Sequence, residues 1–334
     1  SGVWIMAYTT IDKPSDYFET TTYSGNNSNQ SITSLDFAPN WVWFKGRSGT
    51  NSEQDHQLFD TVRGVEKRLA SNTNGAESTD DVGLTAFNSN GWTMGSASQI
   101  NGASTTYVGW SWKKTADAGF DIVSYSGNNS TNRQISHSLS AKPDMMLVKC
   151  RQAGLWKIYH SSLGATKYLV LSDTAGVVDN NSTWNDTEPT SSNFTLGDDG
   201  NVNETGETYI NYLFAEKQGY SKFGSYEGNG NADGTFVYLG FKPAFLIVKP
   251  IDATDNWVMF DNKRLGFNSS TSPFNFYANK NFAETTDTGQ LDFVSNGFKI
   301  RNGGGTVNKT STYIYMAFAE QPFVTSTGVP ATAK

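Results

Sequence analysis

The chain of 334 residues is longer than one hydrophobic core usually supports, so two or three domains are expected. Only 17% of its residues are charged, while Gly, Asn, Ser and Thr are plentiful, which favours strands and polar turns over long helices. The net charge is −7, and the sequence contains no basic stripe that would bind nucleic acid. It also contains no apolar run of about eighteen residues, the length that crosses a membrane. The single cysteine, Cys150, allows no disulfide within the chain.

The first predicted element is a strand that carries Trp4, Met6 and Tyr8 on alternate positions. Its sequence at residues 5–8 resembles that at residues 315–318, so residues 1–16 are predicted to be the closing strand of a preceding copy plus a linker. Two explanations remain open. The chain could be cut from a longer protein, which we favour, or the strand could pair with a neighbouring subunit.

Three repeated patterns indicate an internal triplication. The hexapeptide Tyr-Ser-Gly-Asn-Asn-Ser at residues 23–28 recurs unchanged at 125–130, with a looser form at 226–229. Gly and Asn accept a positive φ at low cost, so each hexapeptide is predicted to be a strand end that enters a tight turn.

A second pattern keeps its spacing in all three copies and encloses a short apolar run, as expected of a buried strand. Its members are Leu35, Pro39 and Lys45, then Leu139, Pro143 and Lys149, then Leu239, Pro243 and Lys249. We expect each lysine to lay its stem along the core and to lift its ammonium group to water.

A third pattern closes each copy with an alternating strand, whose apolar residues should face the core. These residues are Val108, Trp110 and Trp112, then Ile210, Tyr212 and Phe214, then Ile314, Met316 and Phe318. The chain is therefore predicted to be all-β, with three tandem β-sandwich or jelly-roll-like domains at 17–116 (copy 1), 117–219 (copy 2) and 220–324 (copy 3), followed by a tail at 325–334.

The sequence points to no catalytic residues. It contains no HExxH pattern and no GxSxG nucleophile elbow. His56 and His160 lie in the middle of their copies, with Asp261 near the equivalent place in copy 3, so these positions could ligate a metal, although polar strand ends are the favoured interpretation. A glycan hydrolase would need two carboxylates across a sugar site, and a sequence alone cannot show that geometry.

Calcium is the metal that the polar turns favour most. Two Gly-rich loops place oxygen-bearing side chains at alternate positions, as calcium loops do, but neither has the glutamate that closes an EF-hand loop. The candidate ligands are Asp198, Asp199 and Asn201 in one loop and Asn229, Asn231 and Asp233 in the other. Ordinary polar turns between strands explain the same composition.

The tryptophans fall into two groups. Trp41, Trp43, Trp92, Trp110 and Trp112 match ordinary apolar residues in the other copies, so they are predicted to be core residues. Trp184 lies in a polar segment unique to copy 2, at residues 180–187, and is predicted to be an exposed contact for a glycan or another subunit.

Strings at residues 60–64, 69–72, 76–77, 87–92 and 107–110, and the end of the chain at 315–323 and 329–334, carry a resemblance to known proteins. The strings resemble a poorly characterised repeat domain in predicted virion proteins of marine bacteriophages, and the end of the chain is similar to the C-termini of such proteins. The resemblance spans the chain, but copy 2 lacks the Asp-Thr-Val-Arg-Gly string of residues 60–64. It implies a structural or appendage role and supplies no catalytic residues.

The resemblance leads to one functional expectation and one alternative. We expect a non-enzymatic structural component of a bacteriophage particle, either a tail fibre or a capsid decoration, on the virion surface or outside the cell. It could attach to host surface glycans, bind other virion proteins and form a homo-oligomer, with a trimer favoured. The alternative is a free extracellular carbohydrate-binding adhesin or glycan hydrolase.

Overall fold

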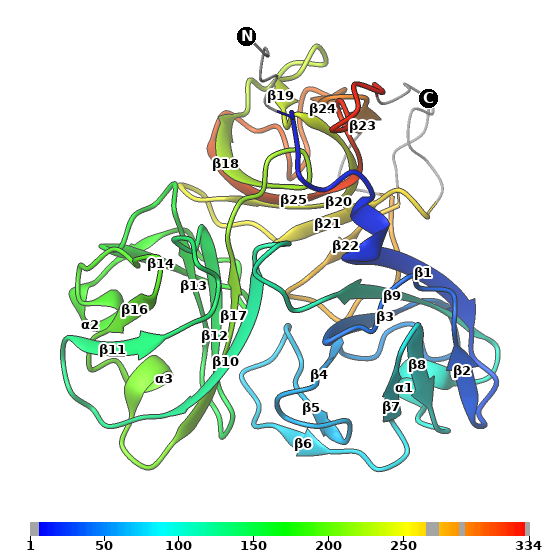
Figure 1. The fold of residues 1–334 in the computed structure, drawn as a ribbon, viewed down its shortest axis with the longest axis horizontal. Helices are drawn as coiled ribbons and strands as arrows, with labels where there is room; N and C mark the ends of the chain where they lie inside the picture. Colours follow the sequence, from blue (N-terminus) through cyan, green and yellow to red (C-terminus); the bar gives the residue numbers. More distant parts are fainter. Residues whose placement is uncertain (1–6, 265–273, 287–290, 331–334) are drawn as a thin grey trace, which may run out of the picture.

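The computed structural model describes residues 7–264, 274–286 and 291–330. It is all-β, with several separate antiparallel sheets and only single-turn helices. Three lobes surround a common centre, coloured blue to cyan for copy 1, green for copy 2 and yellow to red for copy 3 (Figure 1). In the described part of the chain, no helix is long and apolar enough to cross a membrane.

Copy 1 contains a four-stranded sheet and a smaller sheet that covers its outer face. The larger sheet has the order β1 (Phe18–Ser24), β9 (Thr105–Trp112), β3 (Trp41–Gly49) and β4 (Gln57–Asp60). The smaller has the order β2 (Gln30–Ile32), β8 (Gly91–Met94) and β7 (Leu84–Asn88). Short elements complete the copy: η1 (Pro14–Asp16), β5 (Lys67–Arg68), β6 (Ser78–Thr79) and α1 (Ser98–Asn101).

Copies 2 and 3 repeat this topology. In copy 2 the larger sheet is β10 (Phe120–Ser126), β17 (Thr208–Phe214), β12 (Met145–Cys150), β13 (Trp156–His160), β14 (Lys167–Val170) and β15 (Val178–Asp179), the smaller is β11 (Arg133–Ser136) and β16 (Asn193–Leu196), and the helices are α2 (Asn181–Trp184) and α3 (Gly200–Asn203). In copy 3 the larger sheet is β18 (Ser221–Glu227), β25 (Thr312–Pro322), β20 (Phe241–Pro250), β21 (Val258–Asp261) and β22 (Phe276–Tyr277), and the smaller is β19 (Phe236–Tyr238), β24 (Gly297–Ile300) and β23 (Leu291–Val294).

Both faces of each larger sheet are buried, which explains the apolar runs in their central strands. Along β3, Trp41 and Trp43 belong to a central cluster shared by all three copies, whereas Val42 and Phe44 belong to a cluster inside copy 1. Copies 2 and 3 have inner clusters of their own. The predicted burial of the five core tryptophans is confirmed, and all of them are fully buried: Trp41, Trp43, Trp92, Trp110 and Trp112.

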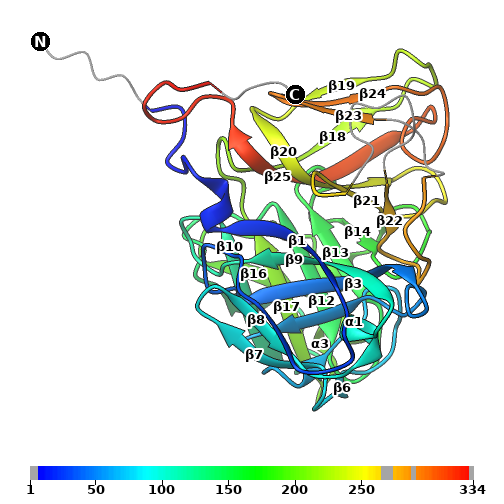
Figure 2. The same ribbon diagram turned by 90° about the vertical axis from the view of Figure 1, so that its right-hand side faces the viewer.

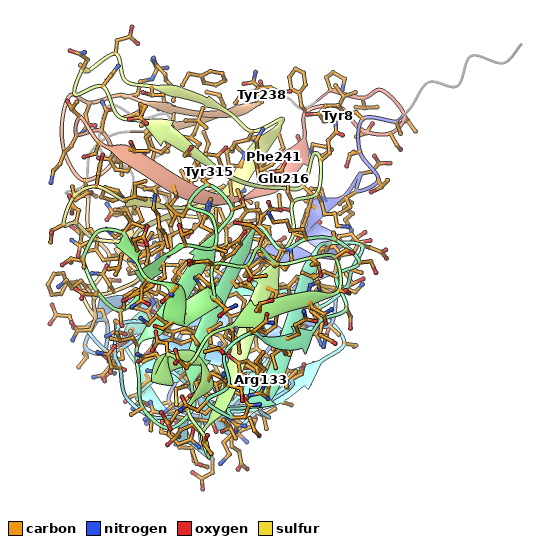
Figure 3. All side chains as sticks on the ribbon, turned by 90° about the vertical axis from the view of Figure 1, so that its left-hand side faces the viewer. Tyr8, Arg133, Glu216, Tyr238, Phe241 and Tyr315 are labelled. Atoms are coloured by element: carbon orange, nitrogen blue, oxygen red, sulfur yellow. The ribbon has the colours of Figure 1, made fainter. Side chains whose placement is uncertain are left out.

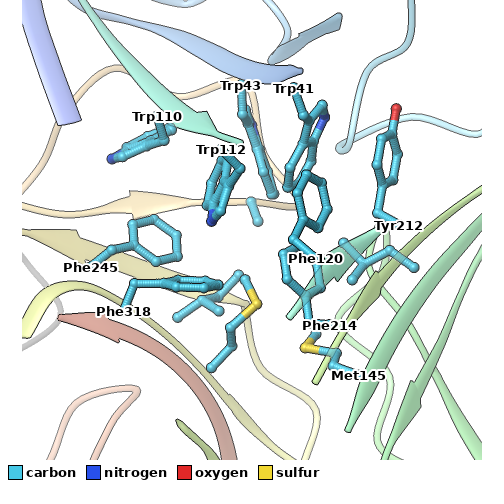
Figure 4. Packing of buried hydrophobic residues seen from close by; sticks show 14 of the residues in the cluster. Trp41, Trp43, Trp110, Trp112, Phe120, Met145, Tyr212, Phe214, Phe245 and Phe318 are labelled. Atoms are coloured by element: carbon cyan, nitrogen blue, oxygen red, sulfur yellow. The ribbon is translucent and has the colours of Figure 1, made fainter. Parts of the chain in front are cut away.

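The central cluster joins the three copies into one body. The Trp41 ring lies 4.5 Å from the ring of Tyr212 in copy 2, and the Phe18 ring lies 5.2 Å from that of Phe318 in copy 3. Phe214 and Phe318 close the circle at 5.8 Å (Figure 4). The copies are therefore not strung out as an extended array of separate sandwiches, because their largest apolar faces are buried against one another.

The repeated hexapeptide forms the turn that its composition predicts. Asn27 and Asn129 have φ values of 57° and 55°, in the left-handed region that Asn tolerates. A buried asparagine from the same copy holds each turn: the side-chain amide of Asn101 donates to the Ser28 carbonyl at 2.6 Å, and that of Asn203 donates to the Ser130 carbonyl at 2.9 Å. The sequence analysis missed these asparagines.

The described part of the N-terminal segment packs against copy 3. The Tyr8 hydroxyl donates to the Gly240 carbonyl at 2.7 Å, Thr9 donates to the Gln218 carbonyl at 2.7 Å, and Ile11 is buried in the central cluster. Trp4 and Met6, on which the strand prediction rests, lie outside the described residues.

Candidate functional site

Several buried polar side chains lie where one copy meets the next. We call the contacts between copies 1 and 2 the first seam, those between copies 2 and 3 the second seam, and those between copies 3 and 1 the third seam. Strand pairing aligns the copies residue by residue and makes Asp60, His160 and Asp261 equivalent. The suggested equivalence of His56 with His160 is wrong, because His56 lies four residues earlier, at the place of Trp156 and Trp257.

A buried acid or histidine at the end of β4, β13 and β21 reaches into the next copy. The Tyr212 hydroxyl of copy 2 donates to the Asp60 carboxylate at 2.7 Å across the first seam. Trp110 of copy 1 donates its indole N–H to Asp261 at 3.0 Å across the third seam. At the second seam, the Nε2 of His160 lies 3.1 Å from the Tyr315 carbonyl.

Buried arginines neutralise the two aspartates and extend the charged network across the seam. At the first seam, Arg63 pairs with Asp60 and also contacts Glu77, which forms a two-point ion pair with Arg151 of copy 2. The third seam repeats this network with other residues: Asp261, Arg264, Glu284 and Arg47.

The second seam keeps the backbone contact without the charges. Glu77 donates its backbone N–H to the Arg151 carbonyl at 2.7 Å, and Val177 donates to the Ile251 carbonyl at the same distance. Leu163 stands at the place of the arginine, and it packs with Val177 and Ile251 against the central cluster. This substitution explains why copy 2 lacks the Asp-Thr-Val-Arg-Gly string.

An aromatic N–H adds a further contact to each seam. Trp156 donates to the Ala70 carbonyl at 2.8 Å, Trp257 donates to the Val170 carbonyl at 2.9 Å, and the Nε2 of His56 lies 3.1 Å from the Tyr277 carbonyl. The other ring nitrogen of His56 accepts from Trp43, so its Nε2 carries the proton. Burial lowers the pKa of His56 well below its usual value and keeps the ring neutral.

His56 and His160 are therefore seam residues, not neighbours in a metal site. His137 lies elsewhere, at the surface, with its Nε2 3.2 Å from the Thr190 carbonyl. Within the described residues, no group of three or more His, Cys, Asp or Glu side chains could hold a metal ion.

The repeated lysines do not lift their ammonium groups to water, so that prediction is wrong. Lys45, Lys149 and Lys249 are fully buried, and each donates to the backbone carbonyl of the following residue. Lys249 also reaches across the second seam to the Thr174 carbonyl, at 3.2 Å. Burial lowers the pKa of Lys45 to about 7 and the pKa values of Lys149 and Lys249 to about 8.

Trp184 is buried, with only 1% of its surface exposed, so the prediction of an exposed contact is wrong. Asn180 caps helix α2 through the Ser182 N–H, and the helix turns the indole inward, where it donates to the Lys167 carbonyl at 3.1 Å. The ring fills the inner cluster of copy 2, and the neighbouring Thr183 is buried beside it. The ring therefore has no surface to offer a glycan.

Four of the six calcium candidates, Asp199, Asn201, Asn229 and Asp233, use side-chain oxygen atoms in contacts within the protein. Asp199 caps helix α3 by accepting from Asn201, and its other oxygen lies 2.9 Å from the buried Lys157 ammonium group. Its loop neighbour Asp198 is not in this ion pair. In the other loop, Asn229 accepts from the backbone of Asn231 and from the amide of Asn308, and Asp233 pairs with Lys299. A calcium ion takes six to eight oxygen ligands, so binding at either loop would have to replace these contacts, and calcium stays a prediction.

Two carboxylates line a cavity of about 240 Å³ at the third seam. Glu19 forms an ion pair with Lys263 at 3.1 Å, and Glu320 forms one with Lys242 at 2.9 Å. A glycan hydrolase divides acid and base or nucleophile roles between two carboxyl groups. Here each carboxylate is already paired with a lysine.

Glu216 is a carboxyl group whose pKa is raised, chiefly by burial, and it lies at the second seam. It accepts from the Phe223 N–H at 3.4 Å and is influenced by the charge of Lys222 on the neighbouring strand. Figure 3 shows it at the level where copy 3 rests on the other copies, near Tyr315. Lys114 and Asp121 hold the corresponding place at the first seam as an ion pair, so we assign Glu216 a seam role as well.

The outer sheet of copy 3 carries exposed aromatic side chains that the other copies lack. Phe236 and Tyr238 are 46% and 48% exposed and point to the same face of β19, while Val237 between them is buried. The register places Ser31 of copy 1 and Gln134 of copy 2 at the position of Phe236. We call Phe236 and Tyr238 the aromatic face; their strand, β19, lies at the top of the molecule, away from copies 1 and 2 (Figure 2).

The family comparison treats the three copies as one unit. Comparisons with curated proteins and with solved structures found no match. A family model, described as "Domain of unknown function (DUF7483)", matches residues 13–322 and so covers all three copies and all three seams. Because this match includes most of the chain, the protein belongs to the DUF7483 family.

Proposed function

We propose that the protein is a non-enzymatic structural component of a bacteriophage particle, either part of a tail fibre or appendage or a decoration of the capsid surface. Each copy acts as a sandwich-like unit of a rigid body that is exposed on the particle. Its partners are other particle proteins and further copies of the chain. The sequence resemblance supplies this setting, and the geometry of the seams supplies the physical support.

The observation that carries the proposal is the use of the buried polar groups. In an enzyme, groups with perturbed pKa values gather at a pocket, where they meet a substrate. Here the buried acids, arginines and histidines connect one copy to the next, as with Asp60, His160 and Asp261. Polar contacts between the copies stabilise their arrangement, and a component of a particle requires such a stable arrangement.

The packing of the three copies around a common centre also limits how the protein can associate with further chains. The largest apolar faces and the seam residues are already buried against other copies. Association with further chains, for which a trimer remains the favoured form, must therefore use the outer surfaces. The described N-terminal residues from Tyr8 onward are held by copy 3 and are not free to exchange without breaking contacts.

Light scattering on the purified chain tests the proposal. We expect a stable homo-oligomer, measured beside a variant that lacks residues 1–7 and keeps Tyr8. An oligomer that dissociates on this truncation, with an unchanged melting temperature, would show that the first residues join subunits. A monomer at every concentration would contradict the particle role and favour the alternative of a free adhesin, for which the aromatic face of copy 3 is the supporting observation.

A further inference from the structure

We infer that the aromatic face of copy 3 binds a glycan chain, with sugar rings stacked on Phe236 and Tyr238. The inference rests on the proposed function for its setting, because it names the surface and the ligand class through which a particle component would attach. The binding itself is a property of the isolated chain and is testable without a particle.

The spacing of the two rings suits consecutive sugars. Residues two apart on a strand lie about 7 Å from each other on the same face, and Phe236 and Tyr238 occupy such positions on β19. Aromatic rings offer a flat apolar surface that packs against the C–H face of a pyranose. Two rings in line along an edge strand therefore present a short track instead of a single contact.

Charged side chains beside the rings can bind sugar hydroxyl groups. Lys299 lies opposite Phe236 in the register and pairs with Asp233, whose side chain is 91% exposed. Further along the same sheet, Arg301 pairs with Asp292 at 2.6 Å. These ion pairs retain exposed donors and acceptors, and they balance in charge, so they suit a neutral polyhydroxylated ligand.

The Tyr238 ring is held in place before any ligand binds. Its hydroxyl lies 3.4 Å from that of Tyr8, which in turn donates to the Gly240 carbonyl, and the Lys222 ammonium group lies 5.5 Å from the ring centroid. Gly297 is the register partner of Tyr238 and adds no side chain beside the ring. An ordered ring loses little conformational freedom on binding, which favours affinity.

The same face in copies 1 and 2 serves as an internal comparison. In copy 1, Ser31 forms a hydrogen bond with Thr93 across the sheet at 2.8 Å. In copy 2, Ser136 donates to Asn193 at 3.0 Å. These polar pairs satisfy one another, as expected of a face that only meets water. The exposed rings of copy 3 therefore do not follow from the shared fold and need a separate explanation.

The size of the face favours a glycan over a protein. A Phe or Tyr side chain offers about 150–250 Å², so two rings at 46% and 48% exposure present roughly 200 Å². A stable protein interface needs about 800 Å² on each partner. A glycan can bind through two or three of its sugar rings, so its contact fits the smaller area.

The test compares two variants on an array of bacterial polysaccharides, followed by calorimetric titration with the polysaccharide that gives the strongest signal. The Phe236→Ser and Tyr238→Thr double variant installs Ser31 and the adjacent Thr33 of copy 1 at the equivalent positions. The control is Phe282→Ser, because Phe282 is 53% exposed and lies in a separate segment of copy 3. Equal melting temperatures for all three proteins would confirm that they are folded.

We expect the double variant to bind at least ten-fold more weakly and the control to bind like the parent chain. Equal binding by the double variant, or no binding by the parent to any polysaccharide, would overturn the inference. A parent that binds only immobilised peptides would overturn it as well and identify the face as a protein contact. If the chain binds a glycan but is monomeric in light scattering, the inferred glycan site is supported and the proposed particle role is contradicted.

Discussion

The first and second seams join equivalent surfaces with different chemistry. At the first seam, buried Asp60 and Arg63 form an ion pair that continues through Glu77 to copy 2. At the second seam, His160 and Leu163 occupy the same two places, and the backbone contacts persist. The comparison shows that closure depends on the shared backbone geometry and apolar packing, whereas the charged network can be exchanged. This agrees with the general finding that apolar residues can replace a buried ion pair as a set but not one partner at a time.

Removing one member of the first seam should have the largest effect. The Arg63→Leu substitution introduces the residue of the second seam but leaves Asp60 and Glu77 without their buried partner. An uncompensated buried charge costs about 3–5 kcal/mol. We expect a loss of that size in the free energy of unfolding, measured by urea denaturation.

Exchanging the whole set provides the control. A variant with Asp60→His, Arg63→Leu, Glu77→Val and Arg151→Ile carries the side chains of the second seam at the first. It should recover most of the stability that Arg63→Leu loses, because no charge remains unpaired. If the fourfold variant is less stable than the single one, the two seams are not interchangeable and the proposed equivalence is wrong.

Acidification should weaken the second seam through His160. Burial lowers the pKa of His160 to about 4, from an ordinary value of 6.5. Between these two pH values, His160 binds a proton in the unfolded chain but stays neutral in the folded chain. Its contribution to the free energy of unfolding is therefore complete above pH 6.5 and is lost as the pH falls toward 4. The difference of about 2.5 pKa units corresponds to an upper limit on the order of 3 kcal/mol.

The His160→Gln variant isolates this contribution. Glutamine can donate to the Tyr315 carbonyl but does not titrate, so its stability should fall less than that of the parent chain between pH 6.5 and pH 4. Both proteins keep His56 and His137, whose pKa values are also lowered, chiefly by burial. Parallel stability curves for the two proteins would show that His160 does not carry the pH dependence.

The sequence predicted the local structure well because local structure follows from local patterns. Alternation identified the buried faces of the strands, and the repeated hexapeptide identified a turn in which Asn27 adopts a positive φ. The failures share a physical cause. Trp184 has polar neighbours, yet a single capped helical turn directs its ring inward. Lys45 lies within β3, and the carbonyl of Ser52, from another segment, accepts from its ammonium group.

The seams could not be predicted in the same way, because most of their contacts join residues 74 or more positions apart. One signal was present in the sequence. Asp60 and Arg63 in copy 1 share their spacing with Asp261 and Arg264 in copy 3, and an acid that repeats three residues before an arginine is unusual for a solvated turn. The resemblance to virion proteins could not have shown closure either, since it supplied no contacts. The aromatic face would have required the register, which pairs Phe236 on β19 with Lys299 on the neighbouring strand β24.

The smallest expected effect concerns the aromatic hydrogen bond that recurs at every seam. Replacing Trp257 with Phe keeps most of the apolar contact and removes the N–H that donates to the Val170 carbonyl at the second seam. Trp156→Phe makes the same change at the first seam, where Ala70 accepts. Losing a buried hydrogen bond and leaving its acceptor unpaired costs about 1–3 kcal/mol.

Because the second seam has no ion pair between its acid or histidine position and an arginine, we expect Trp257→Phe to lower the free energy of unfolding more than Trp156→Phe does. Equal losses in urea denaturation would mean that the hydrogen bonds act independently of the charges beside them, and the seams would then be sums of separate contacts instead of cooperative units.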